Sequence, residues 1–178
     1  MPTKILHGDL GCTTFEAMEL PEKMLLNDVL EKLYAFCAYQ ERCKQDVIKK
    51  LNKLEIPSKF HSDYLQHLEE EKFINEFRYA DAFTRGKIRQ NKWGRIKIKH
   101  ALFQKGIPSS LIEEAFSSIN EEEYLNTLKK VLMSKQKTLR QSDPRVVKYK
   151  LVQYAAGKGF ESGIIYETLE EITRNLQP

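Results

Sequence analysis

Apolar residues recur along this chain at the three- and four-residue spacing of amphipathic helices. Val47, Leu51 and Leu54 mark one face of a helix, and Tyr64 and Leu68 mark a face of the next. The two-residue alternation typical of strands is rare. The pattern therefore predicts an all-α protein.

The hydrophobic pattern also repeats at long range. When the sequence is aligned with itself at an offset of 51 residues, apolar positions match apolar positions, as Leu51 matches Leu102 and Ile56 matches Ile107. A further shift of 53 residues places Gly106 on Gly159 and adds a third copy. A period of this length is typical of helical arrays in which neighbouring units bury a shared core.

Each copy is predicted to contain a tight stop between two helices. Gly106 and Gly159 each precede a large apolar residue, and a glycine just past a helix can take the left-handed conformation that ends it. The first copy has Glu55 at this place, so the end of that helix is less sharply specified.

Upstream of each helix pair lies another amphipathic stretch, which completes a three-helix unit. These stretches are Val29 to Tyr39, Phe77 to Arg89 and Tyr124 to Leu139. Ser110, Asn120 and Asp143 are expected to cap helices that start beside them.

The predicted architecture is three tandem three-helix repeats that form an elongated, curved array. The expected organisation is an N-terminal extension over residues 1–26 and repeats over 27–72, 73–119 and 120–178. The extension contains Pro2, Gly8, Gly11 and Pro21 and is expected to be irregular.

Composition agrees with a thin array. Of the 178 residues, 41% are hydrophobic and 30% are charged, so each unit can bury only a modest core. The net charge of +4 carries little information by itself. The three cysteines, Cys12, Cys37 and Cys43, have neither disulfide-framework nor metal-site spacing, which predicts a reducing cytoplasm. Without a long apolar run, no contact with a membrane is expected.

No catalytic signature is present. The chain lacks a glycine-rich phosphate loop, an HExxH pattern and a GxSxG pattern. His61 and His67 are six residues apart and would lie on different faces of a helix, which disfavours a metal site. We therefore expect a non-enzymatic protein with no cofactor, no metal and no catalytic residues.

One segment has a distinctive charge pattern. Between residues 85 and 99 the chain contains seven cations, no acid and one tryptophan: Arg85, Lys87, Arg89, Lys92, Trp93, Arg95, Lys97 and Lys99. Such a segment suits a nucleic-acid backbone or an acidic protein surface. The alternative is a solvated face, with Trp93 as a core anchor.

Two more cations extend this predicted basic face. Lys44 and Lys148 occupy the positions equivalent to Arg95 in the first and third copies, near the start of the second helix. In a curved stack, equivalent positions would line one side as a basic stripe, which suits a filament or groove.

The central copy contains three distinctive pieces in order: Phe-Arg-Tyr-Ala-Asp-Ala-Phe at 77–83 with its following cations, Trp93-Gly94-Arg95, and the helix ending in Lys105-Gly106-Ile107. In this order the pieces resemble the RecX family, whose members restrain the RecA recombinase. The resemblance spans residues 28–172. The chain departs from the pattern at Glu55 and at Glu161, which replaces the proline of the other copies.

The resemblance implies a regulator of recombination, DNA repair and the SOS response. Members bind the RecA filament on single-stranded DNA and inhibit its ATPase, strand-exchange and coprotease activities; some also touch single- or double-stranded DNA. By likeness, this protein would be a monomer that acts by preferring one filament state.

Two other functions stay open at this point. An autonomous DNA-binding protein could use a three-helix unit as a helix-turn-helix reader, although the basic segment includes the turn and has few Asn or Gln residues. A purely structural adaptor would leave ATP turnover unchanged.

Overall fold

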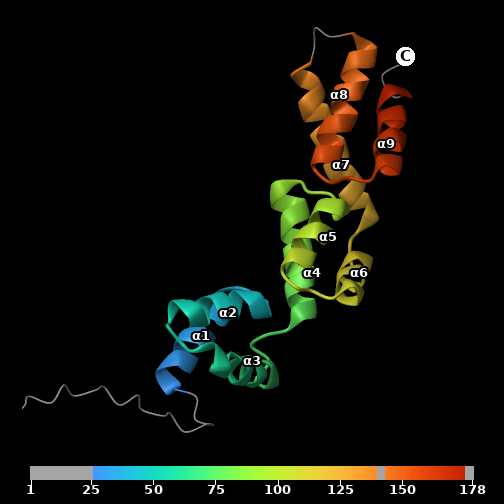
Figure 1. Cartoon of the computed structure of the whole chain (residues 1–178). Helices are drawn as coiled ribbons and strands as arrows, with labels where there is room; N and C mark the ends of the chain where they lie inside the picture. The colour runs from blue at the N-terminus through green and yellow to red at the C-terminus, as the bar shows by residue number, and fades with distance from the viewer. Residues whose placement is uncertain (1–25, 140–142, 175–178) are drawn as a thin grey trace, which may run out of the picture.

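The expected all-α repeat fold is confirmed. The structure, a computed structural model (Figure 1), describes residues 26–139 and 143–174, which contain helices and turns but no strand. The α-helices are α1 Asn27–Tyr39, α2 Lys44–Lys53, α3 His61–Glu70, α4 Glu76–Gly86, α5 Arg95–Gln104, α6 Ser109–Ser117, α7 Glu121–Lys137, α8 Pro144–Gly157 and α9 Ser162–Arg174. A 3-10 turn, η1, spans Ser58–Phe60, and a π-helical turn, η2, spans Lys87–Asn91.

The helices are grouped in threes along an elongated, bent array (Figure 1). We call α1–α3 the first trio, α4–α6 the middle trio and α7–α9 the last trio. Most of the predicted N-terminal extension, residues 1–25, lies outside the described residues.

Two of the three predicted caps are confirmed. The side chain of Asn120 accepts from the Glu123 N–H at 3.0 Å, and that of Asp143 accepts from the Arg145 N–H at 2.7 Å. The prediction for Ser110 is wrong, because α6 already begins at Ser109 and its N-cap is Pro108. Pro108 is extended, with ψ of 145°, and the helix starts directly after it.

The tight stops follow the predicted glycines. Gly106 and Gly159 have φ of 76° and 89°, and the next residue in each copy donates its N–H back to the preceding helix. Glu55 adopts the same left-handed conformation with φ of 58°, although a side chain there carries a steric penalty. The backbone geometry is thus shared by all three copies even where glycine is absent.

The hydrophobic core is divided unequally among the trios. Leu33, Val47, Leu51 and Leu68 belong to a cluster confined to the first trio and the adjoining Ile74. A second, larger cluster runs without interruption through the middle and last trios and also includes Cys43. The middle and last trios therefore form one packed body, to which the first trio is attached through a smaller contact.

Consecutive trios meet in a repeated way, and we call the two contacts the first joint and the second joint. In each, an asparagine caps the incoming first helix, and the fourth residue of that helix is a buried tyrosine: Asn75 and Tyr79 at the first joint, Asn120 and Tyr124 at the second. Each tyrosine packs toward the start of the second helix in the preceding trio.

At the second joint the two backbones touch. The Gly94 N–H donates to the Lys158 carbonyl at 2.9 Å, and the Ile96 N–H donates to the Gly159 carbonyl at 3.0 Å. A Cβ on Gly94 would lie 2.1 Å from the Gly159 oxygen, which is too close for any side chain to fit. The second joint consequently requires glycine at position 94.

We predict that Gly94→Ala lowers the free energy of unfolding by more than about 2 kcal/mol, because the methyl group forces the middle and last trios apart. Urea unfolding followed by circular dichroism measures this change. The control is Gly86→Ala: a Cβ there meets nothing within 4 Å, and the higher helix propensity of alanine should leave stability equal or raise it by up to about 1 kcal/mol. Equal effects of the two substitutions would contradict the close approach.

Candidate functional site

The structure pairs about half of the predicted basic face with carboxylates. Lys44 binds Glu69 at 2.8 Å and Arg89 lies 3.4 Å from Glu123. Arg85 pairs with Asp81, Lys99 with Glu113, and Arg95 with both Glu121 and Glu161. Segments distant in sequence supply most of these acids. The acid-free run between residues 85 and 99 is therefore not an acid-free surface.

The four remaining predicted cations have other neighbours. Lys87 and Lys97 lie against Trp93, with their ammonium nitrogens 5.0 and 4.8 Å from its ring centroid. The Lys92 ammonium donates to the carbonyl of Arg89, and the Lys148 ammonium is 5.9 Å from the ring of Tyr166. Aromatic faces attract these charges but do not neutralise them.

Backbone geometry explains how Lys87, Trp93 and Lys97 come together. Helix α4 ends at Gly86, and the chain continues through the π-helical turn η2 to Lys92, which is left-handed with φ of 55°. This wide turn brings the indole beside Lys87 from η2 and Lys97 from α5. Trp93 is half-buried: it packs against the large core, and its ring also contacts the two ammonium groups.

The same chemistry continues across the second joint. The carbonyl of Lys158 accepts from Gly94, next to Trp93. The Tyr154 ring, 40% exposed, has the ammonium groups of Lys135 and Lys158 at 5.3 and 5.9 Å from its centroid. We call these residues the cation–aromatic strip; its members are Lys87, Trp93, Lys97, Lys135, Tyr154 and Lys158.

Sequence reasoning missed the half of the strip that lies in the last trio. Lys135, Tyr154 and Lys158 are scattered over two helices and a turn, so no run of cations indicates them. The available signal was the Lys-Gly pair shared by 105–106 and 158–159, which places a lysine at each joint.

Comparison of the two joints shows where charge is left uncompensated. At the first joint Lys105 forms an ion pair with Asp46 of α2. The repeat places Lys97 at the position of Asp46 and Lys158 at the position of Lys105. Two lysines at the second joint thus replace an ion pair, and neither has a carboxylate partner within the described residues.

The pKa values of one residue at each joint are shifted by burial and by hydrogen bonds. Burial alone would raise the pKa of Asp46, but hydrogen bonds from Lys105 and Cys43 outweigh it and hold the pKa below its ordinary value. Burial, reinforced by the hydrogen bond to Glu161, raises the pKa of Tyr124, whose hydroxyl also accepts from the Arg95 N–H at 2.9 Å. Both joints are therefore built on fixed protonation states near neutral pH.

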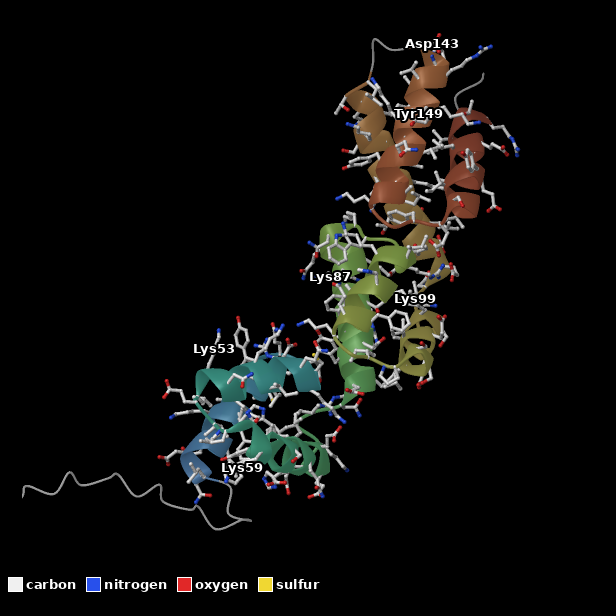
Figure 2. The ribbon with its side chains drawn as sticks, in the orientation of Figure 1. Lys53, Lys59, Lys87, Lys99, Asp143 and Tyr149 are labelled. Carbon is white, nitrogen blue, oxygen red and sulfur yellow. The ribbon has the colours of Figure 1, made fainter. Side chains whose placement is uncertain are left out.

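The predicted residues do not all lie on one surface. Lys87 and Lys99 lie on different sides of the middle trio (Figure 2), and Lys99 is held by Glu113 of α6. Lys44 and Arg95 start α2 and α5 as expected, but Lys148 lies inside α8, which begins one turn earlier at Pro144. The structure brings together Lys87, Trp93 and Lys97 and separates them from Lys99.

The described residues contain neither a metal-ligand cluster nor a membrane-spanning helix. Across residues 26–139 and 143–174, no three His, Cys, Asp or Glu side chains are grouped so as to hold a metal ion. Within the same ranges, no helix combines the length and apolarity needed to cross a bilayer.

The fold and its repeated joints define a tandem helical-repeat protein made of three-helix units, and comparisons with known proteins identify the family. Residues 75–115 match the second three-helix domain of RecX, and residues 121–169 match the third. The regulatory protein RecX of Clostridium acetobutylicum is 31% identical over 160 residues, which cover 83% of this chain and 74% of that protein. The regulatory protein RecX of Oceanobacillus iheyensis is 28% identical over 169 residues, and the match covers 88% of this chain but 61% of that protein.

Solved structures agree. A crystal structure of regulatory protein RecX superposes with a TM-score of 0.71 at 27% identity, covering 80% of this chain and 74% of that one. RecX from Lactobacillus salivarius has the same fold, with a TM-score of 0.71 at 24% identity, covering 83% of this chain and 99% of that one. The chain therefore belongs to the RecX family and is a RecX-type regulatory protein.

We predict that Asp46→Asn lowers the free energy of unfolding by about 1–2 kcal/mol at neutral pH, because Lys105 loses its partner at the first joint. The pKa of folded Asp46 lies below its ordinary value of 3.8, so its contribution is complete above that value. The contribution is lost as the pH falls through the lower folded pKa.

Urea unfolding of the wild type and of Asp46→Asn from about pH 7 to about pH 3 measures this dependence. The two proteins should differ by a constant amount above about pH 5 and converge in acid. Asp63→Asn, at an exposed position of α3, is the control and should change stability little. A difference that grows on acidification would contradict the assignment.

Proposed function

We propose that this protein binds the RecA filament on single-stranded DNA and inhibits its ATPase, strand-exchange and coprotease activities. The proposal rests on membership of the RecX family and on one feature of the surface. That feature is the pair Lys97 and Lys158, which stands where the first joint has a neutralising ion pair. Two lysines at these positions lack the attraction that the ion pair gives the first joint, so their presence is better explained by an anionic partner than by folding.

The shape of the molecule supports the same proposal. The cation–aromatic strip crosses from the middle trio to the last trio, which share one core and therefore hold it rigidly. A long rigid face with unpaired cations suits the groove of a nucleoprotein fibre, where phosphates and acidic side chains recur along the axis. A rigid face also favours the filament state whose spacing it matches, which is how binding without chemistry can alter turnover.

Reversing the charge of the strip should weaken inhibition of the cognate recombinase. For the triple variant Lys87→Glu, Lys97→Glu and Lys158→Glu, we expect the concentration giving half-maximal inhibition of DNA-dependent ATP hydrolysis to rise about tenfold or more. The ATPase assay on single-stranded DNA, with the protein titrated in, measures it.

A matched control distinguishes the effect of the strip on inhibition from the effect of net charge. Lys32, Lys53 and Lys130 are exposed lysines outside the strip, and their triple replacement by Glu changes the net charge by the same amount. The control should inhibit nearly as well as the wild type, with both variants retaining their helical circular dichroism. Equal inhibition by the two variants would reject the strip as the contact.

A second function, direct binding of free single-stranded nucleic acid, is favoured by the two aromatic rings of the strip. Trp93 is the only tryptophan of the chain, so its fluorescence reports on base stacking at this place. A salt titration with oligonucleotide and with recombinase filament distinguishes the two functions. The leading proposal expects tighter binding to the filament than to free single-stranded or duplex DNA at every salt concentration.

A further inference from the structure

The far end of the last trio has the surface that the other two trios use to receive a neighbour. In each trio this surface consists of the end of the first helix, the start of the second and the end of the third. In the first trio it receives Tyr79 and the Lys105–Gly106 turn, and in the middle trio it receives Tyr124 and the Gly159–Phe160 turn. In the last trio no further unit follows within the described residues.

A groove of about 1060 Å³ occupies this place, between the end of α7, the start of α8 and the end of α9. Asp143, the cap of α8, marks this end of the array (Figure 2). The groove has an apolar lining made of Leu132, Leu139, Val147, Leu151, Leu169 and Ile172.

The repeat shows that this lining corresponds to joint residues. Leu151 is equivalent to Ile98 of the middle trio and to Val47 of the first trio, and all three are buried. Ile98 lies in the core cluster that also contains Tyr124 and Phe160 from the incoming trio. The groove therefore occupies the position in the last trio that is equivalent to the receiving surfaces of the two joints.

The charges at the rim indicate what the groove accepts. Its charged lining residues are four cations and a single acid: Lys137, Arg145, Lys148, Arg174 and Glu170. Lys148 is equivalent to Arg95, which pairs at the second joint with Glu121 in the first turn of the incoming helix. Lys148 has no carboxylate partner among residues 26–139 and 143–174.

We propose that this groove docks the N-terminal turns of a helix from a partner protein, with acidic residues in the first turn and an aromatic residue at the fourth position. Both helices seated at the joints have this character: α4 begins with Glu76 and α7 with three glutamates, and each has its tyrosine fourth. The groove lies apart from the cation–aromatic strip, so its occupation does not depend on filament binding.

The groove differs from the second joint in one way that affects which aromatic residue it accepts. Arg95 is the first residue of α5, and its free N–H donates to the Tyr124 hydroxyl. Lys148 lies inside α8, where the backbone N–H is used by the helix itself. The aromatic ring of the partner is therefore held by apolar contact, and phenylalanine should serve as well as tyrosine.

The test uses a synthetic peptide with the sequence of residues 118–131 of this chain, which begins with the cap and acidic turn of α7. The peptide is titrated into the isotope-labelled full-length protein and followed by amide chemical shifts. We expect shifts centred on Leu132, Lys148, Leu151 and Ile172. The peptide carrying Tyr124→Phe should bind equally, whereas the peptide carrying Tyr124→Ala should lose most of its affinity.

Protein variants provide the matched comparison. Lys148→Glu should weaken peptide binding about fivefold or more by repelling the acidic turn. Lys130→Glu, an exposed change on α7 outside the groove, should leave the affinity unchanged. Both replacements are at the surface, so the spectra of the unbound variants should otherwise match the wild type.

Three outcomes overturn the proposal. The first is a titration without shifts at the groove, which would mean that the end is covered or inert. The second is equal weakening by Lys148→Glu and Lys130→Glu. The third is concentration-dependent assembly of the chain alone, seen by sedimentation and abolished by Lys148→Glu, which would assign the groove to a second copy.

Discussion

The contact between consecutive three-helix units is the interaction on which the whole structure depends. A trio of short helices buries only a modest apolar core, so contacts between neighbouring trios add to the stability of each. The molecule makes these contacts by inserting a tyrosine from a capped helix start beside the second helix of the preceding trio. This repeated contact sets the shape of the array. It therefore also sets where the surface charges lie relative to one another.

The two joints nevertheless differ in kind. The second is closed by backbone hydrogen bonds through Gly94 and by a continuous core, whereas the first depends more on side chains, with Lys105 on Asp46 and Arg78 on Glu41 at 3.0 Å. Ion pairs near the surface contribute less and are screened by salt. The middle and last trios therefore act as a rigid unit, and the charges on the surface that they share are held at fixed spacings.

Sequence reasoning was most successful where local chemistry and the repeat agree. The left-handed stops at Gly106 and Gly159 follow from glycine alone, and the caps Asn120 and Asp143 follow from side chains that reach the next turn. Ser110 misled because the Ile107–Pro108 pair already fixes where α6 starts. The charge run misled for another reason: Glu113, Glu121 and Glu161 come from distant segments, and sequence proximity cannot show such neutralisation.

Residues that no run of charge in the sequence indicates can be found by comparing equivalent positions at the two joints. Position 46 is an acid where position 97 is a lysine, and that exchange removes the partner of the lysine arriving from the next trio. The same comparison shows that Arg95 forms ion pairs with two carboxylates. Its counterpart Lys148 forms none with the residues that the structure describes. In a repeat protein the copies serve as internal controls for one another. A position that departs from its copies without a structural benefit is one whose residue folding alone does not explain.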